Sequence, residues 1–243
     1  MSAELIDSLT SYCFPYDIRL TNEQSASLVR HLELVQETNK CINLTRITSL
    51  DDALILHILD SLLAWKVLSA RFSPTDVSVN FLDMGTGAGY PGVCFSIMSE
   101  WKATLLDSVG KKVKAVESFC KELGLDDVEC VHDRLESYAL SHRHIFNFVV
   151  ARAVASFPVL MEYATPFLKK DGILCVMKAN PSLEELEAAE RASKVCGLSL
   201  VSRETFDLPR SSGHREIFLY KLVSNPSIKL PRQVGKARKE PLA

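Results

Sequence analysis

A carboxylate and four glycines stand close together in residues 83–92, which read Asp-Met-Gly-Thr-Gly-Ala-Gly-Tyr-Pro-Gly. Glycine carries no Cβ, so a turn built from it lets the backbone approach a ligand closely. Val79, Phe81 and Leu82 lie just before the turn and predict a buried strand of a parallel sheet. Pro91 suits the first turn of the helix that follows. A strand, a glycine turn and a helix N-terminus together predict a site for a nucleotide-like ligand in an open α/β sheet.

The glycine turn fits two patterns. Residues 83–89 read D-x-G-x-G-x-G, which is typical of S-adenosylmethionine-dependent methyltransferases, and residues 87–92 read G-x-G-x-x-G, the dinucleotide fingerprint. Asp83 favours the first pattern, because a dinucleotide fingerprint places its first glycine directly after the strand. We therefore expect Asp83 to lie beneath the turn, and Gly85 and Gly87 to cradle the methionine part of the cofactor. A nicotinamide-dependent oxidoreductase is the alternative.

Two later positions suit the nucleoside part of the same cofactor. Asp107 ends a predicted strand about 20 residues past the turn, where such folds place an acid that accepts hydrogen bonds from both ribose hydroxyls. The alternative role for Asp107 is to cap the helix predicted over residues 110–124. Leu135 follows the next strand, where it is expected to pack on an adenine ring while a nearby carboxylate or backbone N–H meets the ring's polar edge.

The fourth predicted strand is followed by a cation instead of an acid. Arg152 lies at its carboxyl end, and arginine cannot act as a base at neutral pH because it stays protonated. A ring nitrogen such as N7 of guanine already exposes its lone pair, so methyl transfer to it needs mainly alignment and exclusion of water. Lys178, at the end of the fifth strand, is expected on the same rim. Arg152 and Lys178 are therefore predicted to position the acceptor without a general base.

The elements that must hold these residues alternate between strand and helix, which predicts a mostly parallel sheet with helices on both faces. Seven segments predict strands, and the last two form a closing antiparallel hairpin: residues 79–83, 103–107, 128–131, 145–151, 172–178, 198–206 and 216–222.

The chain before the sheet shows only helical patterns. Thr21 and Ser49 are predicted helix caps, and His57 lies on the third helix, where a lone histidine usually has a structural role. We expect three segments: an N-terminal helical extension at 1–75, a methyltransferase domain at 76–224 and a basic tail at 225–243.

Composition excludes several classes of protein. The seven cysteines are scattered without a C-x-x-C pair, which argues against a disulfide framework or a zinc site, so no metal is expected. No apolar run approaches the ~20 residues that a membrane span needs, and the N-terminus does not resemble a signal peptide. A cytoplasmic protein that does not bind membranes is therefore expected.

The net charge of −2 means that any surface for nucleic acid must be local. The tail at 225–243 has five cations against one anion, and its prolines and glycine favour a mobile segment. Such a tail is either an arm that binds phosphates or an untethered solubilising terminus.

From about Asn39 to the C-terminus the chain resembles a known family, the bacterial 16S rRNA methyltransferase G, also called glucose-inhibited division protein B. The matching segments, in order, are Asn43-Leu-Thr45, His57-Ile-Leu-Asp-Ser61, residues 83–92, Thr104-Leu-Leu-Asp-Ser108 with Gly110-Lys111, Arg152-Ala153 with Ala155-Ser156, and residues 231–242.

The resemblance implies a Rossmann-like class I fold, S-adenosyl-L-methionine as cofactor with S-adenosyl-L-homocysteine as product, and methyl transfer to N7 of a guanine in 16S rRNA of the 30S subunit. It implies cofactor contacts at Gly85, Tyr90, Leu135, Glu136 and Arg152. Tyr90 stands where the family more usually has leucine. A monomer is expected, and a non-catalytic ribosomal RNA-binding or assembly protein is a further alternative.

Overall fold

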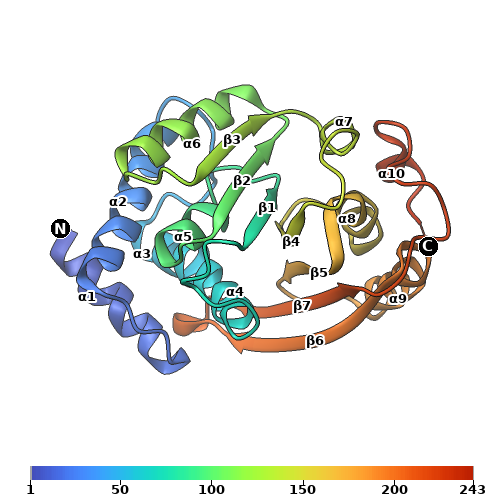
Figure 1. The fold of residues 1–243 in the computed structure, drawn as a ribbon. Coiled ribbons are helices and arrows are strands. Elements are labelled where there is room, and N and C mark those ends of the chain that lie inside the picture. Colours follow the sequence, from blue (N-terminus) through green and yellow to red (C-terminus); the bar gives the residue numbers. More distant parts are fainter. Residues whose placement is uncertain (1, 243) are drawn as a thin grey trace.

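The computed structural model describes residues 2–242 and contains a seven-stranded sheet in the order β3-β2-β1-β4-β5-β7-β6 (Figure 1). The first five strands along the chain pair in parallel, whereas β7 runs antiparallel to both β5 and β6. The strands are β1 (Asn80–Met84), β2 (Lys102–Asp107), β3 (Val128–His132), β4 (Phe146–Arg152), β5 (Leu168–Lys178), β6 (Leu198–Asp207) and β7 (His214–Leu222). The predicted fold class and the closing hairpin are confirmed.

Helices cover both faces of this sheet (Figure 1). They are α1 (Ser2–Cys13), α2 (Asn22–Asn39), α3 (Leu50–Ala53), α4 (Asp60–Ser69), α5 (Gly92–Met98), α6 (Gly110–Glu122), α7 (Leu135–Tyr138), α8 (Phe157–Ala164), α9 (Leu183–Cys196) and α10 (Lys236–Lys239). The helices α1, α2 and α4 to α6 share one hydrophobic core with the sheet, and α7 to α10 share a second core on its other face. No helix among residues 2–242 is long and apolar enough to cross a membrane.

The N-terminal helices pack directly on the first core. Leu9, Leu32 and Leu62 are fully buried in the same cluster as Phe81 and Phe148, whose rings stack at 4.9 Å in the centre of the sheet. Apolar burial of this kind is the main force that would hold the helices against the sheet. The division of the chain at residues 75 and 224 stays a prediction.

Both predicted helix caps are present. Thr21 Oγ1 accepts from the Gln24 N–H at 3.1 Å, and the Gln24 side chain accepts from the Thr21 N–H at 3.0 Å, which completes a capping box. Ser49 Oγ accepts from the Asp52 N–H at 3.3 Å at the start of α3.

The structure departs from the predicted elements at two places. The helix capped by Ser49 does not run on as a regular α-helix, because a π-helical segment, Leu54–Leu59, joins α3 to α4. The fifth strand begins at Leu168 and not at residue 172, with Asp171 at a positive φ of 63°. The polar residues 169–171 are typical of a loop, and their side chains are partly or fully exposed, so the strand could not be recognised from hydrophobicity.

Candidate active site

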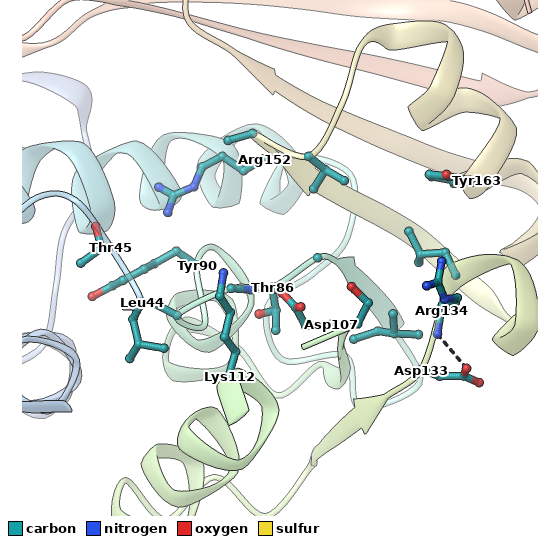
Figure 2. A pocket seen from close by; sticks show the side chains of 18 of the residues that line it. Leu44, Thr45, Thr86, Tyr90, Asp107, Lys112, Asp133, Arg134, Arg152 and Tyr163 are labelled. Carbon is teal, nitrogen blue, oxygen red and sulfur yellow. Dashed lines mark hydrogen bonds between the residues drawn. The ribbon is translucent and has the colours of Figure 1, made fainter. Parts of the chain in front are cut away.

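A cavity of about 780 Å³ opens at the carboxyl ends of β1, β2 and β4, where the strand order reverses. This is the position at which open α/β sheets bind ligands, and the volume suits a small molecule. In Figure 2, Arg152, Tyr90 and Thr45 lie at one end of the cavity and Arg134 and Tyr163 at the other. Residues from five elements or loops thus converge on one space.

The structure brings most of the predicted site residues together. Of the eight residues predicted to bind cofactor, seven line the cavity: Gly85, Gly87, Tyr90, Asp107, Leu135, Glu136 and Arg152. Asp83 lies below the turn and is not part of the lining. Thr45, Thr86, Lys112, Asp133 and Tyr163 also line the cavity, although none of them was predicted as a site residue.

The glycine turn packs too tightly for other residues. Gly85 and Gly89 have φ angles of 72° and 92°, in the left-handed region. A Cβ on Gly85 would lie 2.9 Å from Val154 Cγ2, and one on Gly89 would lie 2.6 Å from Val93 Cγ2. The turn is also tied to β2, because the Gly85 N–H donates to the Leu106 carbonyl at 2.8 Å. Its backbone therefore forms a fixed wall of the cavity.

Asp83 supports this turn from beneath. Its Oδ2 accepts from the Gly92 N–H at 2.9 Å, at the N-terminus of α5, where a carboxylate is favoured by the helix dipole. Burial raises the pKa of Asp83 to about 6. The Thr86 hydroxyl and the Gly92 N–H act against this rise in the pKa.

Asp107 links the turn to the next helix. Its Oδ2 accepts from the Gly87 N–H at 3.0 Å and its Oδ1 accepts from the Val109 N–H at 2.9 Å, just before α6. Each carboxylate oxygen has two lone pairs, so Asp107 can accept further hydrogen bonds from a ligand in the cavity. The ribose role is therefore compatible with this geometry. The alternative role as a helix cap is wrong, because Val109 is the N-cap residue of α6 and no side chain caps that helix.

Arg152 is held by the π-helical segment. Its Nη1 donates to the Leu56 carbonyl at 3.1 Å and to Asp60 Oδ2 at 3.1 Å, and Arg215 Nε donates to Asp60 Oδ1 at 2.8 Å. A π-helix pairs residues five apart, so its carbonyls point differently from those of an α-helix, and such segments often occur at functional sites. The guanidinium also lies 5.3 Å from the centre of the Tyr90 ring.

His57 belongs to the cavity, although a structural role is the usual one for a lone helical histidine. Its ring stacks on Tyr90 at 4.7 Å, and its Nε2 lies 2.8 Å from Thr45 Oγ1. Burial and the nearby Arg152 cation lower the pKa of His57 to about 3. The imidazole is therefore uncharged at neutral pH and is a weak base. Spacing alone could not reveal its contact with Tyr90, 33 residues later in the chain.

Lys178 does not line this cavity. Its ammonium group donates to Glu185 Oε1 at 2.6 Å and to the Ala155 carbonyl at 3.0 Å. It instead lines a smaller cavity of about 310 Å³, which shares Arg152, His57 and Ala153 with the larger one. The two predicted rim cations thus meet around the smaller cavity.

The basic tail folds back on the domain, so the expectation of a mobile tail is wrong. Arg232 makes two hydrogen bonds to the buried Glu162 in α8, at 2.8 and 2.5 Å. The Gly235 N–H donates to Glu136 Oε1 at 2.8 Å, and Gly235 and Arg238 line the cavity. The physical reason is that the buried Glu162 carboxylate requires a cation, which the tail supplies from 70 residues away.

Among residues 2–242, no group of three or more histidine, cysteine, aspartate or glutamate side chains is placed to hold a metal ion.

Solved structures show the same fold. The Burkholderia thailandensis 1,6-didemethyltoxoflavin-N1-methyltransferase, with bound 1,6-didemethyltoxoflavin and S-adenosylhomocysteine, superposes with a TM-score of 0.57 at 14% identity, over 86% of this chain and 93% of that one. A SAM dependent methyltransferase from Aquifex aeolicus gives a TM-score of 0.52 at 18% identity, over 68% of this chain and 92% of that one.

Sequence comparison is more specific. A protein of Lactococcus lactis subsp. lactis named ribosomal RNA small subunit methyltransferase G is 35% identical over 97% of this chain and 98% of its own length. A protein of the same name from Alkaliphilus oremlandii is 36% identical over 98% of this chain and 99% of its own length. A family model described as GidB, rRNA small subunit methyltransferase G, matches residues 24–214. Together with the fold and the cavity, these matches show that the chain belongs to the rRNA small subunit methyltransferase G family.

Proposed function

We propose that this protein transfers a methyl group from S-adenosyl-L-methionine to N7 of a guanine in the 16S rRNA of the small ribosomal subunit, as a cytoplasmic monomer. The observation that carries the proposal is the cavity at the strand-order reversal, which collects seven of the eight predicted cofactor residues. Its position, volume and lining suit a nucleoside-containing cofactor.

The residues of the cavity fit that cofactor. Asp107 presents carboxylate lone pairs for the ribose hydroxyls, and Leu135 with Glu136 lies where the adenine would pack. Gly85 and Gly87 supply the close backbone wall for the methionine part. Asp83 lies outside the lining, so we assign it the role of holding the glycine turn in place.

When bound, the cofactor supplies an electrophilic methyl group, and the protein has to align the acceptor and exclude water. Arg152 is a permanent cation, and His57 has its pKa lowered to about 3, so neither is suited to remove a proton at neutral pH. An acceptor such as guanine N7 needs no deprotonation, so it is suited to a site at which Arg152 and His57 supply no general base. Arg152 therefore acts by position, fixed through Leu56 and Asp60. Lys178 lines only the smaller of the two cavities, so any contact that it makes with the acceptor would be made there.

The side of the molecule that meets RNA is locally basic. Besides Arg152, four cations from four separate segments line the cavity: Arg46, Lys112, Arg134 and Arg238. Neutralising phosphates with such cations releases counterions and gives salt-sensitive affinity. These groups are suited to position the RNA backbone, while recognition of the base must come from elsewhere.

The test is methyl transfer from tritiated S-adenosylmethionine to 30S subunits from a strain that lacks this modification, with naked 16S rRNA as a parallel substrate. We expect label in 16S rRNA from at least one substrate, and unlabelled S-adenosylhomocysteine should inhibit it. Protection against unfolding by NAD but not by S-adenosylhomocysteine would instead indicate an oxidoreductase. Binding to rRNA with no transfer to any substrate would indicate a non-catalytic protein.

A further inference from the structure

The smaller cavity of about 310 Å³ adjoins the proposed cofactor cavity and shares its wall. Arg152, His57 and Ala153 border both spaces, so a group at their junction is within reach of ligands on either side. The smaller cavity is large enough for a purine ring and too small for a nucleotide cofactor of the size proposed for its neighbour.

We propose that this smaller cavity receives the target base, and that the Asp60 carboxylate recognises guanine through its N1–H and N2 amino groups. This inference rests on the proposed function, because it requires the methyl donor to lie in the adjoining cavity. It adds a specificity-determining residue, Asp60, to the positions considered so far.

Asp60 is built into the cavity wall as a fixed acceptor. The residue is 3% exposed, and its carboxylate accepts from Arg152 Nη1 at 3.1 Å and from Arg215 Nε at 2.8 Å, one on each oxygen. Each oxygen keeps a further lone pair, so the carboxylate can also accept from two donors on a base edge. The two guanidinium groups hold the carboxylate in a fixed orientation, as a preorganised recognition group requires.

The neighbouring Arg152 supplies the matching donor. Its Nη2 has only a long contact, 3.5 Å to His57 Nδ1, whereas its Nη1 is committed to Leu56 and Asp60. On guanine, O6 lies between N1–H and N7. A base that donates to Asp60 therefore places O6 beside Arg152 and turns N7 toward the junction of the two cavities, where the methyl group would lie.

The walls of the cavity suit a planar ring. Ile47, Leu56 and Met177 contribute apolar surface around the polar pair of Asp60 and Arg152. Enzymes that act on a base extruded from RNA or DNA read its Watson–Crick edge by hydrogen bonds and pack its faces against apolar or aromatic groups. Adenine would present a lone pair at N1 to the carboxylate and is rejected for that reason.

Asp60 also favours the reaction itself. Methylation at N7 makes the guanine ring cationic, so its N1–H and N2–H donors become stronger as the new bond forms. A carboxylate that accepts from them binds the transition state more tightly than the substrate, and only such differential binding raises the rate.

The test uses reconstituted 30S subunits that carry guanine, inosine or adenine at the single modified position, which is identified first with native RNA. Inosine keeps O6, N7 and N1–H but lacks the N2 amino group. Wild-type protein should methylate the inosine subunit about 10-fold more slowly or worse, which is the expected effect of one lost hydrogen bond to a charged acceptor. Equal rates on guanine and inosine would overturn the inference while leaving the proposed function intact. Transfer to neither substrate would overturn both.

Two variants carry the test further. Asp60→Asn should lower the rate on guanine on the order of 100-fold and bring the guanine-to-inosine ratio to within about 3-fold, because the charged acceptor is lost. An Asp60→Asn protein that keeps the wild-type ratio contradicts the assignment. Because Asp60 also fixes Arg152, S-adenosylhomocysteine binding and thermal unfolding are measured in parallel.

The second variant, Ala179→Phe, leaves the Asp60 ion pairs unchanged and fills the cavity from its rim, where Ala179 is exposed. It should bind S-adenosylhomocysteine like wild type and lose at least about 10-fold in transfer, since a blocked pocket forfeits the alignment of the base. Wild-type transfer by Ala179→Phe would contradict the placement of the base.

Discussion

At the scale of the residue, the proposed cofactor site is tested most simply at Asp107. Its carboxylate accepts from the Gly87 and Val109 N–H groups and still faces the cavity. Asp107→Ala should weaken S-adenosylhomocysteine binding on the order of 100-fold in isothermal titration calorimetry, since hydrogen bonds to a charged group each contribute about 1.5–3 kcal/mol.

The matched control is Asp127→Ala. Asp127 is exposed, lies just before β3 and does not line the cavity. This variant should bind S-adenosylhomocysteine within about 3-fold of wild type, as expected for a surface substitution. If Asp107→Ala also bound normally, the ribose role of Asp107 would be wrong.

Two buried histidines make the protein sensitive to acid. Burial lowers the pKa of His31 to about 4 and that of His57 to about 3, whereas burial raises the pKa of Asp83 to about 6. Below pH 6.5 the unfolded chain binds protons at both histidines that the native protein does not bind, so stability falls as the pH drops. At pH 5.5 each histidine lowers the free energy of unfolding by about 1 kcal/mol. Asp83 acts in the opposite direction and raises it by somewhat less than one histidine lowers it.

His31→Gln separates these contributions. The free energy of unfolding in urea should fall less in this variant than in wild type between pH 7.5 and 5.5, by about 1 kcal/mol, because one proton-binding site of the unfolded chain is gone. If the free energy of unfolding of His31→Gln fell by as much as that of wild type, the buried imidazole would not resist protonation in the native state.

At the scale of the element, the C-terminal tail packs across the end of the cavity at which Glu136 lies, and we call this segment, residues 225–242, the strap. Glu162 is 1% exposed, and its ionic partner is Arg232. Arg232→Ala leaves that carboxylate buried without its cation, which should destabilise the packing of the tail by about 3–5 kcal/mol. We expect a lower melting temperature, earlier protease cleavage after residue 224 and weaker S-adenosylhomocysteine binding through loss of the Gly235–Glu136 contact.

Lys239→Ala is the control for the tail, because Lys239 is an exposed cation of the same segment. It removes the same unit of charge without unpairing a buried group, so its melting temperature should match wild type. If Arg232→Ala melted and resisted protease like Lys239→Ala, the strap would not depend on the buried ion pair.

At the scale of the whole molecule, the net charge is −2, and the proposed surface for RNA is the local group of cations at the opening of the larger cavity. Arg46 is exposed at the cavity, whereas Lys102 begins β2 at the opposite end of the sheet. Arg46→Gln should weaken 30S binding and reduce the slope of log affinity against log salt by about 1, while S-adenosylhomocysteine affinity stays unchanged. Lys102→Gln is the control and should leave the slope of log affinity against log salt at its wild-type value. If the two variants gave equal slopes, Arg46 would not belong to the surface that binds RNA.

The sequence allowed the fold to be predicted because its signals are local. The glycine turn, Asp107 and Arg152 each follow a recognisable strand, and the carboxyl ends of parallel strands meet at one edge of the sheet. The site contacts that were missed all join distant segments. His57 stacks on Tyr90, and Arg232 pairs with Glu162, and no periodicity or composition predicts such pairs.

The π-helical segment was missed for a different reason. Its residues Leu54–Leu59 have the same apolar spacing as a regular helix, so the wider turn that presents Leu56 to Arg152 leaves no sign in the sequence. Lys178 shows the limit of a prediction from strand position alone, since its ammonium group is taken by Glu185 and Ala155.

The most direct test of the proposed activity is the position and chemistry of the methyl group. After reaction of the wild-type protein with unmodified 30S subunits or 16S rRNA, borohydride reduction followed by aniline cleaves the RNA at 7-methylguanine, and primer extension locates any cut that is absent from unreacted RNA. We predict a single new cut in 16S rRNA that requires S-adenosylmethionine and that Asp107→Ala makes only at a higher S-adenosylmethionine concentration than wild type needs. Methyl label in the RNA without any such cut, or no label at all, would contradict the account.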